Sequence, residues 1–151
     1  MNDEFYMNLA LKEAEKALWI DEVPVGAVLV DKNSNVVGKG YNSPISSSDP
    51  TSHAEINAIR MACLVLKNYR LIDTVLYVTI EPCVMCMGAI IHARIKRVVF
   101  GANDVKWGAV NSLYTMAEDN RLNHNPEIVS GICEDKAKKM IKDFFKNKRS
   151  N

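Results

Sequence analysis

The stretch "TVLYVTIEPCVMCMGAIIHARIKRVVFG", residues 74–101, decides the fold class. It opens with an apolar, β-branched run at 74–80 and closes with another at 96–101, and both runs are typical of buried strands. The segment between them, 83–93, follows Pro82, and proline suits the first turn of a helix. A strand, a helix and a second strand in this order predict two parallel strands in one sheet.

The rest of the chain extends this alternation on both sides. Helices are expected at residues 2–20, 53–67 and 134–148. Strands are expected at residues 25–31, 35–42 and 127–132, the first two forming a hairpin. The remainder reads as loop, with one helical turn between 102 and 125. This order predicts a single α/β domain over residues 1–151, three layers thick, whose sheet is mostly parallel after its first pair of strands.

The composition is that of an ordinary globular protein. Hydrophobic residues make up 48% and charged residues 25% of the 151, so a core can form without disulfides. The first residues do not resemble a secretory signal, and no stretch approaches the roughly 18 apolar residues of a membrane span. Four cysteines in such a chain indicate the reducing cytoplasm, where a close pair binds metal or does redox work.

Charge is unevenly distributed along the chain. Residues 1–22 hold six acidic residues against two lysines, whereas residues 136–149 hold seven Lys or Arg against Asp143. A basic tail of this kind is often only a solvated helix face. Phe144 and Phe145 within it favour a nucleic-acid surface, although we expect at least one of the two to belong to the core.

Cys83 and Cys86 stand one helical turn apart, and this spacing fits a redox pair, two ligands of a metal, or two buried core residues. Free N–H groups at a helix start would activate the thiols for either of the first two uses. His53 distinguishes them, because it begins the preceding helix. Consecutive helices reached through one strand can bring their N-terminal ends together at one sheet edge, so His53 can be the third ligand of a zinc ion.

Glu55 is expected beside this metal and not on it. Helix positions two residues apart point about 200° away from each other, so His53 and Glu55 do not grip one ion. Three protein ligands leave one position open, as in catalytic zinc sites. Two thiolates cancel the charge of the ion and acidify its water less than three histidines would, so a base is required. Glu55 is the candidate base, unless it serves only the helix dipole.

The segments His53-Ala54-Glu55 and Pro82-Cys83-Val84-Met85-Cys86 resemble the signature of the zinc-dependent nucleoside and nucleobase deaminases. Further stretches, among them "EVPVGAVLV" (22–30), "DPTSHAEI" (49–56) and "RVVFGANDVKWGA" (97–109), are similar to the bacterial tRNA-specific adenosine deaminases over nearly the whole chain. The resemblance implies a cytidine-deaminase-like α/β/α fold with a central mixed five-stranded sheet. It also implies a homodimer with one zinc per subunit.

The resemblance implies that adenosine at the wobble position of tRNA is converted to inosine by a zinc-activated water, with Glu55 as proton shuttle. It assigns the metal to His53, Cys83 and Cys86. Residues that match the family's substrate contacts are Asn42, Val25 and Ala54 at the base, and Asp104, Lys106, Phe145 and Arg149 at the anticodon loop. Asn42 can equally be a turn residue that ends a strand.

The chain departs from the family pattern at Met87 and at Trp107, which replace smaller residues. Other functions remain open at this point. One is a deaminase of a small substrate such as cytosine, cytidine, deoxycytidylate or guanine. Another is a non-catalytic module whose zinc is closed by Cys63 or His92, and the last is a thiol–disulfide oxidoreductase.

Overall fold

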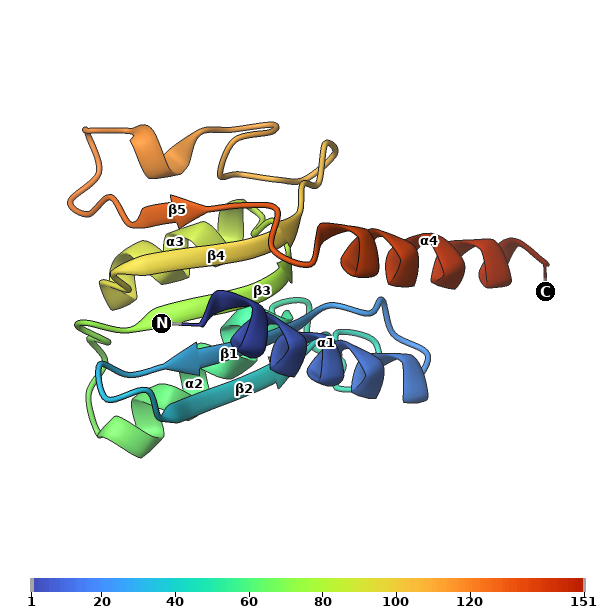
Figure 1. Cartoon of the computed structure of the whole chain (residues 1–151), viewed down its shortest axis with the longest axis horizontal. Helices are drawn as coiled ribbons and strands as arrows, with labels where there is room; N and C mark the ends of the chain where they lie inside the picture. The colour runs from blue at the N-terminus through green and yellow to red at the C-terminus, as the bar shows by residue number, and fades with distance from the viewer. Residues whose placement is uncertain (1, 151) are drawn as a thin grey trace.

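The protein, described by a computed structural model over residues 2–150, has a five-stranded sheet between two layers of helices (Figure 1). The strands are β1 (Gly26–Val30), β2 (Val36–Tyr41), β3 (Val75–Ile80), β4 (Arg97–Ala102) and β5 (Glu127–Val129). The helices are α1 (Asp3–Trp19), α2 (Ala54–Leu66), α3 (Val84–Ala93) and α4 (Glu134–Ser150), with a short 3-10 helix η1 (Met116–Glu118). These elements are the ones that the sequence predicts.

The strand order is β2-β1-β3-β4-β5, and the sheet is mixed. Strand β1 runs antiparallel to both β2 and β3, whereas β3, β4 and β5 are parallel. The expected three-layer α/β fold with a mixed sheet is therefore confirmed. Strand β5 is shorter than expected, because the chain turns toward α4 through Gly131 and Cys133, whose φ angles are positive.

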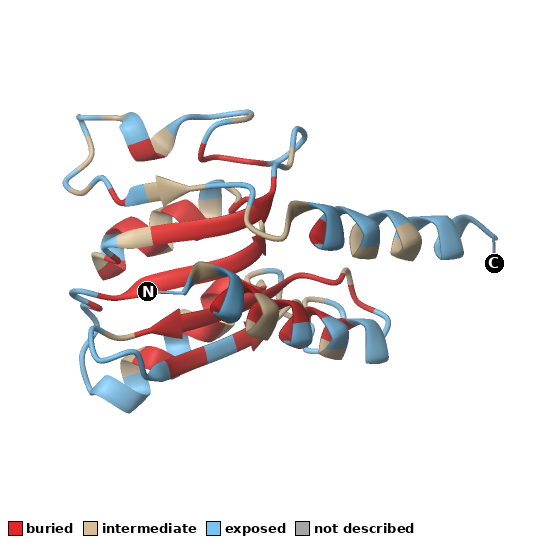
Figure 2. Ribbon diagram, viewed as in Figure 1, coloured by how far each residue is buried: buried red, intermediate tan, exposed pale blue. Residues whose placement is uncertain are grey.

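The central strands are buried on both faces, and this explains their unbroken apolar runs (Figure 2). Leu76 and Val78 of β3 face a large core that also contains residues of α2 and α3. Tyr77 and Val99, which point to the opposite face, pack with residues of α1. Among residues 2–150, no helix combines the length and apolar character that a membrane crossing requires.

Small residues let α2 lie very close to β2. A Cβ at Gly38 would fall 2.3 Å from the carbonyl oxygen of Ala58, and a Cβ at Gly40 would fall 2.3 Å from that of Ala54. Ala54, Ala58 and Ala62 form the fully buried helix face that meets these glycines. This contact fixes where α2 begins, and therefore where the side chains of His53 and Glu55 are placed.

Asp3 attaches α1 to the sheet. Its Oδ1 accepts hydrogen bonds from the Tyr77 hydroxyl and from Nη1 of Arg97, both at 2.8 Å, and its Oδ2 accepts one from Nη2 of Arg97 at 2.7 Å. The hydrogen bond from Arg97 lowers the pKa of Asp3 although burial opposes this. The charged form of Asp3 is thus the form that the fold stabilises.

We expect Asp3→Asn to lower the free energy of unfolding by about 1–2 kcal/mol, the usual contribution of hydrogen bonds to a charged group. Because the folded pKa of Asp3 lies below its ordinary 3.8, its contribution is complete above pH 3.8 and is lost as the pH falls through the lowered value. Urea unfolding at neutral pH and at about pH 3 should therefore show a difference that shrinks in acid. Exposed Glu4→Gln, in the same helical turn, is the control, and an equal loss in both variants would contradict the assignment.

Candidate metal and catalytic site

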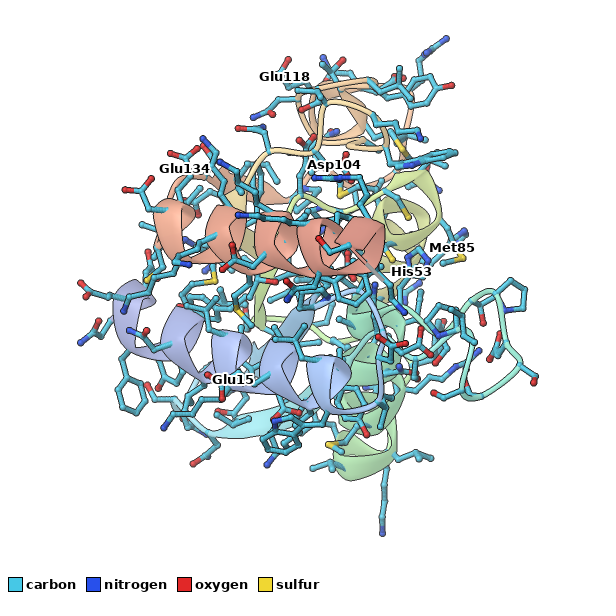
Figure 3. All side chains as sticks on the ribbon, turned by 90° about the vertical axis from the view of Figure 1, so that its right-hand side faces the viewer. Glu15, His53, Met85, Asp104, Glu118 and Glu134 are labelled. Carbon is cyan, nitrogen blue, oxygen red and sulfur yellow. The ribbon has the colours of Figure 1, made fainter. Side chains whose placement is uncertain are left out.

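Two helix N-termini meet at the edge of the sheet where β3 ends. His53 is the N-cap of α2 and Cys83 is the N-cap of α3, while Cys86 lies one turn into α3 and is fully buried. The ligand atoms of these three residues all lie within 4.8 Å of one another. Figure 3 shows His53 and Met85, which lies between the two cysteines, on the same flank of the molecule.

The three donors fit a zinc ion. Nδ1 of His53 lies 3.6 Å from Sγ of Cys83 and 3.6 Å from Sγ of Cys86. Zn–S bonds of about 2.3 Å and a Zn–N bond of about 2.0 Å at a tetrahedral angle would separate nitrogen from sulfur by about 3.5 Å. Two sulfurs and one imidazole are also a donor set that zinc prefers.

The group is not closed by a fourth side chain. In the part of the chain that the structure describes, no further His, Cys, Asp or Glu joins these three. His92 is exposed in the last turn of α3, and Sγ of Cys63 lies 3.9 Å from the carbonyl oxygen of Tyr69. A metal held by three protein donors keeps a position for water or substrate, as catalytic zinc does, so a closed structural module is disfavoured.

The two thiols are not equivalent. Hydrogen bonding to Cys86, helped by His53, lowers the pKa of Cys83 to about 4. Hydrogen bonding to Cys83 and burial raise the pKa of Cys86. A thiolate at Cys83 gives the site negative charge that attracts a cation, and a bound zinc would deprotonate Cys86 as well.

Glu55 lies in the first turn of α2 with only 4% of its surface exposed. Burial raises the pKa of Glu55 to about 7, and the nearby negative charge of Cys83 adds to this effect. Glu55 is not a member of the ligand group, in agreement with the helical spacing. A carboxyl with a pKa near neutral can both accept and donate a proton during a reaction.

Asn42 joins the end of β2 to the start of α2. Its backbone N–H donates to the carbonyl oxygen of Val25 at 3.1 Å, and its Oδ1 accepts the N–H of Ala54 at 2.8 Å. The three residues named for the base pocket are thus linked in one hydrogen-bonded chain that ends beside His53. Since Oδ1 is engaged, the Asn42 amide presents its Nδ2 donors on the other side.

Glu81 has a role that the sequence reasoning missed. It is 3% exposed and directly precedes Pro82 and Cys83. Its carboxylate accepts six hydrogen bonds, from Nδ2 of Asn103, from the N–H groups of Asp104, Val110, Asn111 and Ser112, and from the Ser112 hydroxyl. Burial would raise the pKa of Glu81, but these hydrogen bonds outweigh it and lower the pKa. An acidic residue immediately after an apolar strand was the available signal.

Residues 103–112, the Glu81-bound loop, carry two of the residues that match anticodon contacts. Oδ1 of Asp104 accepts the backbone N–H groups of Lys106 at 3.1 Å and Trp107 at 3.2 Å, so this side chain shapes the loop. The side chain of Lys106 is exposed. A contact of either residue with RNA remains a prediction.

Helix α4 carries the other two residues and projects beyond the sheet (Figure 1). Phe145 is 43% exposed and Arg149 is exposed. The expectation that Phe144 or Phe145 belongs to the core is wrong, because Ala137 alone is buried among the described residues of α4. His124 lies in a loop, where its Nε2–H donates to the carbonyl oxygen of Ile95 at 2.6 Å.

The α/β/α fold, the three converging donors and the buried carboxyl together define a zinc-dependent deaminase. A family model described as "Cytidine and deoxycytidylate deaminase zinc-binding region" matches residues 1–102 and supports one zinc ion in this chain. The chain is also 48% identical over 147 residues to the tRNA-specific adenosine deaminase of Haemophilus influenzae, covering 97% of this chain and 85% of that protein.

Solved structures agree with this class. One, from work on A-to-I editing by tRNA:A34 deaminases at the wobble position, has a TM-score of 0.87, 44% identity, and coverage of 90% of this chain and 98% of that one. A guanine deaminase from Bacillus subtilis has a TM-score of 0.64 and 42% identity. The match covers 68% of this chain and 66% of the guanine deaminase chain. The chain belongs to the family of tRNA-specific adenosine deaminases.

Proposed function

We propose that this chain converts adenosine to inosine at the wobble position of tRNA. The observation that carries the proposal is the three-donor site with buried Glu55 beside it, in a chain similar over nearly its whole length to tRNA-specific adenosine deaminases. When bound by His53, Cys83 and Cys86, zinc supplies a polarised water for attack on a base. In the net reaction water replaces the amino group at C6 of adenine, and ammonia leaves.

Glu55 moves the protons of this reaction. Its carboxylate takes a proton from the attacking water and passes it to N1 of the adenine. It then takes the second proton from the new hydroxyl at C6 and delivers it to the amine, which leaves as ammonia. The pKa of about 7 that burial gives Glu55 supports this assignment, because the same group must act as base and then as acid near neutral pH. The buried position also keeps bulk water from these protons.

Asn42 reads the base by donating from Nδ2 to a ring nitrogen of adenine, with Val25 and Ala54 bounding the slot. Asn42→Asp separates this role from a structural one, because an aspartate still accepts the N–H of Ala54 but donates nothing. We expect Asn42→Asp to lower kcat/KM on tRNA by about 10- to 100-fold with an unchanged melting temperature. If Asn42 only holds the start of α2 through its oxygen, Asn42→Asp will match the unaltered chain and Asn42→Ala alone will be impaired.

The anticodon loop contacts the Glu81-bound loop and α4. Exposed Lys106 and Arg149 neutralise phosphates, and exposed Phe145 stacks on an unpaired base. Asp104 keeps the Glu81-bound loop in shape by accepting the backbone N–H of Lys106. Lys148 is paired with Asp21, so it contributes less than Arg149. Affinity for tRNA is expected to fall as salt is added, because phosphate contacts release counterions.

The chain acts as one domain, as a homodimer, and in the cytoplasm. Exposed apolar side chains at the end of α2 and just after it support self-association: Met61, Leu64, Val65, Tyr69 and Ile72. Four cysteines that are unpaired thiols in the described residues support a reducing compartment. Light scattering after size-exclusion chromatography tests the dimer, and a monomer at micromolar concentration would contradict it.

The function is tested by incubating zinc-quantified protein with transcribed tRNAs, and in parallel with free adenosine, cytidine and guanine. The proposal predicts inosine at the wobble position of a tRNA that carries adenosine there, and little ammonia from the free compounds. Because the chain is similar to a guanine deaminase, the experiment must include free guanine as a substrate. Rapid turnover of guanine or cytidine with none on tRNA would overturn the proposal.

A further inference from the structure

We propose that Trp107 is a stacking surface for an unpaired RNA base that neighbours the target adenosine, and that it extends recognition beyond the base pocket. The inference rests on the proposed function, because it takes an RNA loop as the substrate. Trp107 is not among the residues to which the family resemblance assigns a substrate contact.

The position of Trp107 is tied to the metal-binding turn. The next residue, Gly108, forms an isolated antiparallel bridge with Cys83. The N–H of Ala109 donates to the carbonyl oxygen of Pro82 at 2.8 Å. The backbone at Trp107 therefore lies next to the turn that carries Cys83, at the site that must receive the flipped-out adenosine.

The loop that carries Trp107 is held from both sides. The N–H of Trp107 donates to Oδ1 of Asp104, and the N–H of Gly108 donates to the carbonyl oxygen of Asp104 at 2.7 Å. Behind the turn, Glu81 accepts its hydrogen bonds from 103–104 and 110–112, and a Cβ at Gly108 would fall 2.3 Å from its carboxyl carbon. An aromatic side chain on a loop already ordered in this way loses little entropy when it binds.

The indole itself is available for contact. Trp107 is 61% exposed, although tryptophan is among the side chains that gain most from burial. The ammonium of Lys106 lies 5.8 Å from the centroid of its ring, near the outer limit for a cation–π contact. A flat π surface beside a cation suits a nucleotide, because the base stacks on the ring while the ammonium approaches a phosphate.

Fluorescence tests this contact directly. The chain has two tryptophans, so Trp19→Phe leaves Trp107 as the single indole, and Glu55→Gln in the same chain prevents turnover. We expect an anticodon stem-loop RNA, titrated into this zinc-loaded protein, to quench and shift the emission of Trp107. The control is an RNA hairpin of equal length whose stem is fully paired and whose loop is as short as possible. It should leave the emission of Trp107 nearly unchanged.

Matched substitutions then measure the contribution. Trp107→Ala and Trp107→Leu should weaken the Kd or KM for the RNA by about 5- to 150-fold, the range that base–aromatic stacking gives, while Trp107→Phe and Trp107→Tyr should retain most of it. In chains that keep Glu55, kcat at saturating RNA, zinc content and melting temperature should stay unchanged. If Trp107 had only a structural role, the Ala and Leu variants would have a lower melting temperature. If it made only an apolar contact, Trp107→Leu would bind the RNA as well as the parent chain does.

Two results would overturn the inference: RNA binding that leaves the Trp107 emission unaltered, or a Trp107→Leu chain with the affinity of the parent. Both are distinct from failure of the proposed function. That failure would appear as a zinc-loaded parent chain that forms no inosine in any tRNA, whatever residue stands at position 107.

Discussion

Glu55→Gln should bind zinc and fold normally yet lose at least about a thousandfold in kcat on tRNA, since proton transfer by a positioned carboxyl contributes up to 10⁴-fold and Glu55 serves several transfers. Glutamine nearly matches the shape of glutamate but can neither take a proton from water nor deliver one to N1. Burial has raised the pKa of Glu55 to about 7, so Glu55 is already protonated and neutral in part of the protein molecules at neutral pH. In those molecules the replacement exchanges one neutral group for another. The free energy of unfolding should therefore change little or rise.

The measurements are single-turnover inosine formation, zinc per chain, and the melting temperature. Glu118→Gln, an exposed acid-to-amide change in η1, is the matched control and should be fully active. Near-normal rates in Glu55→Gln would remove Glu55 from the chemistry. Loss of zinc along with activity would instead mean that Glu55 acts on metal binding.

The second large effect concerns the metal ligands. Cys86→Ser should lower zinc content well below one per chain and abolish deamination, because a neutral hydroxyl replaces a thiolate in a three-donor site. Cys86 is also fully buried, so a water molecule from bulk solvent cannot easily take the place of the lost sulfur ligand. With free zinc about a thousandfold above the parent's Kd, loss of the metal should lower apparent stability by about 4 kcal/mol.

Cys63→Ser is the matched control, because Cys63 is a half-buried thiol outside the ligand group. It should keep both zinc and activity. A chelator should reproduce the Cys86→Ser result in the parent chain, and added zinc should restore the parent but not the variant. Full zinc content in Cys86→Ser would show that the metal is held elsewhere.

Much of the fold followed from local patterns. The strand–helix–strand unit at 74–101 was predictable because an apolar run, a proline and a second apolar run each specify local structure with few alternatives. The meeting of His53 with Cys83 and Cys86 followed from that topology, since helices reached through one strand start at the same sheet edge. The ends of elements were less certain, as the short β5 shows, because backbone turns at Gly131 and Cys133 decide them.

What could not be predicted depends on contacts between distant residues. Glu81 looks like an ordinary residue between strand and proline, and its hydrogen bonds come from a loop more than twenty residues later. Phe145 is exposed and Phe144 is half-buried because α4 projects past the sheet, which the amphipathic pattern does not reveal. Asn42 had two possible roles from sequence. The structure gives its oxygen the structural role, and the substrate contact of its nitrogen stays a prediction.

The central claim is that water attacks the base at a zinc held by these three side chains with Glu55 moving the protons. The most direct measurement is mass spectrometry of nucleosides from a tRNA incubated with the zinc-loaded chain in ¹⁸O-labelled water. The account predicts wobble inosine that carries one heavy oxygen and an equal amount of ammonia in solution. Unlabelled inosine, or an untouched wobble adenosine with full zinc occupancy, would contradict it.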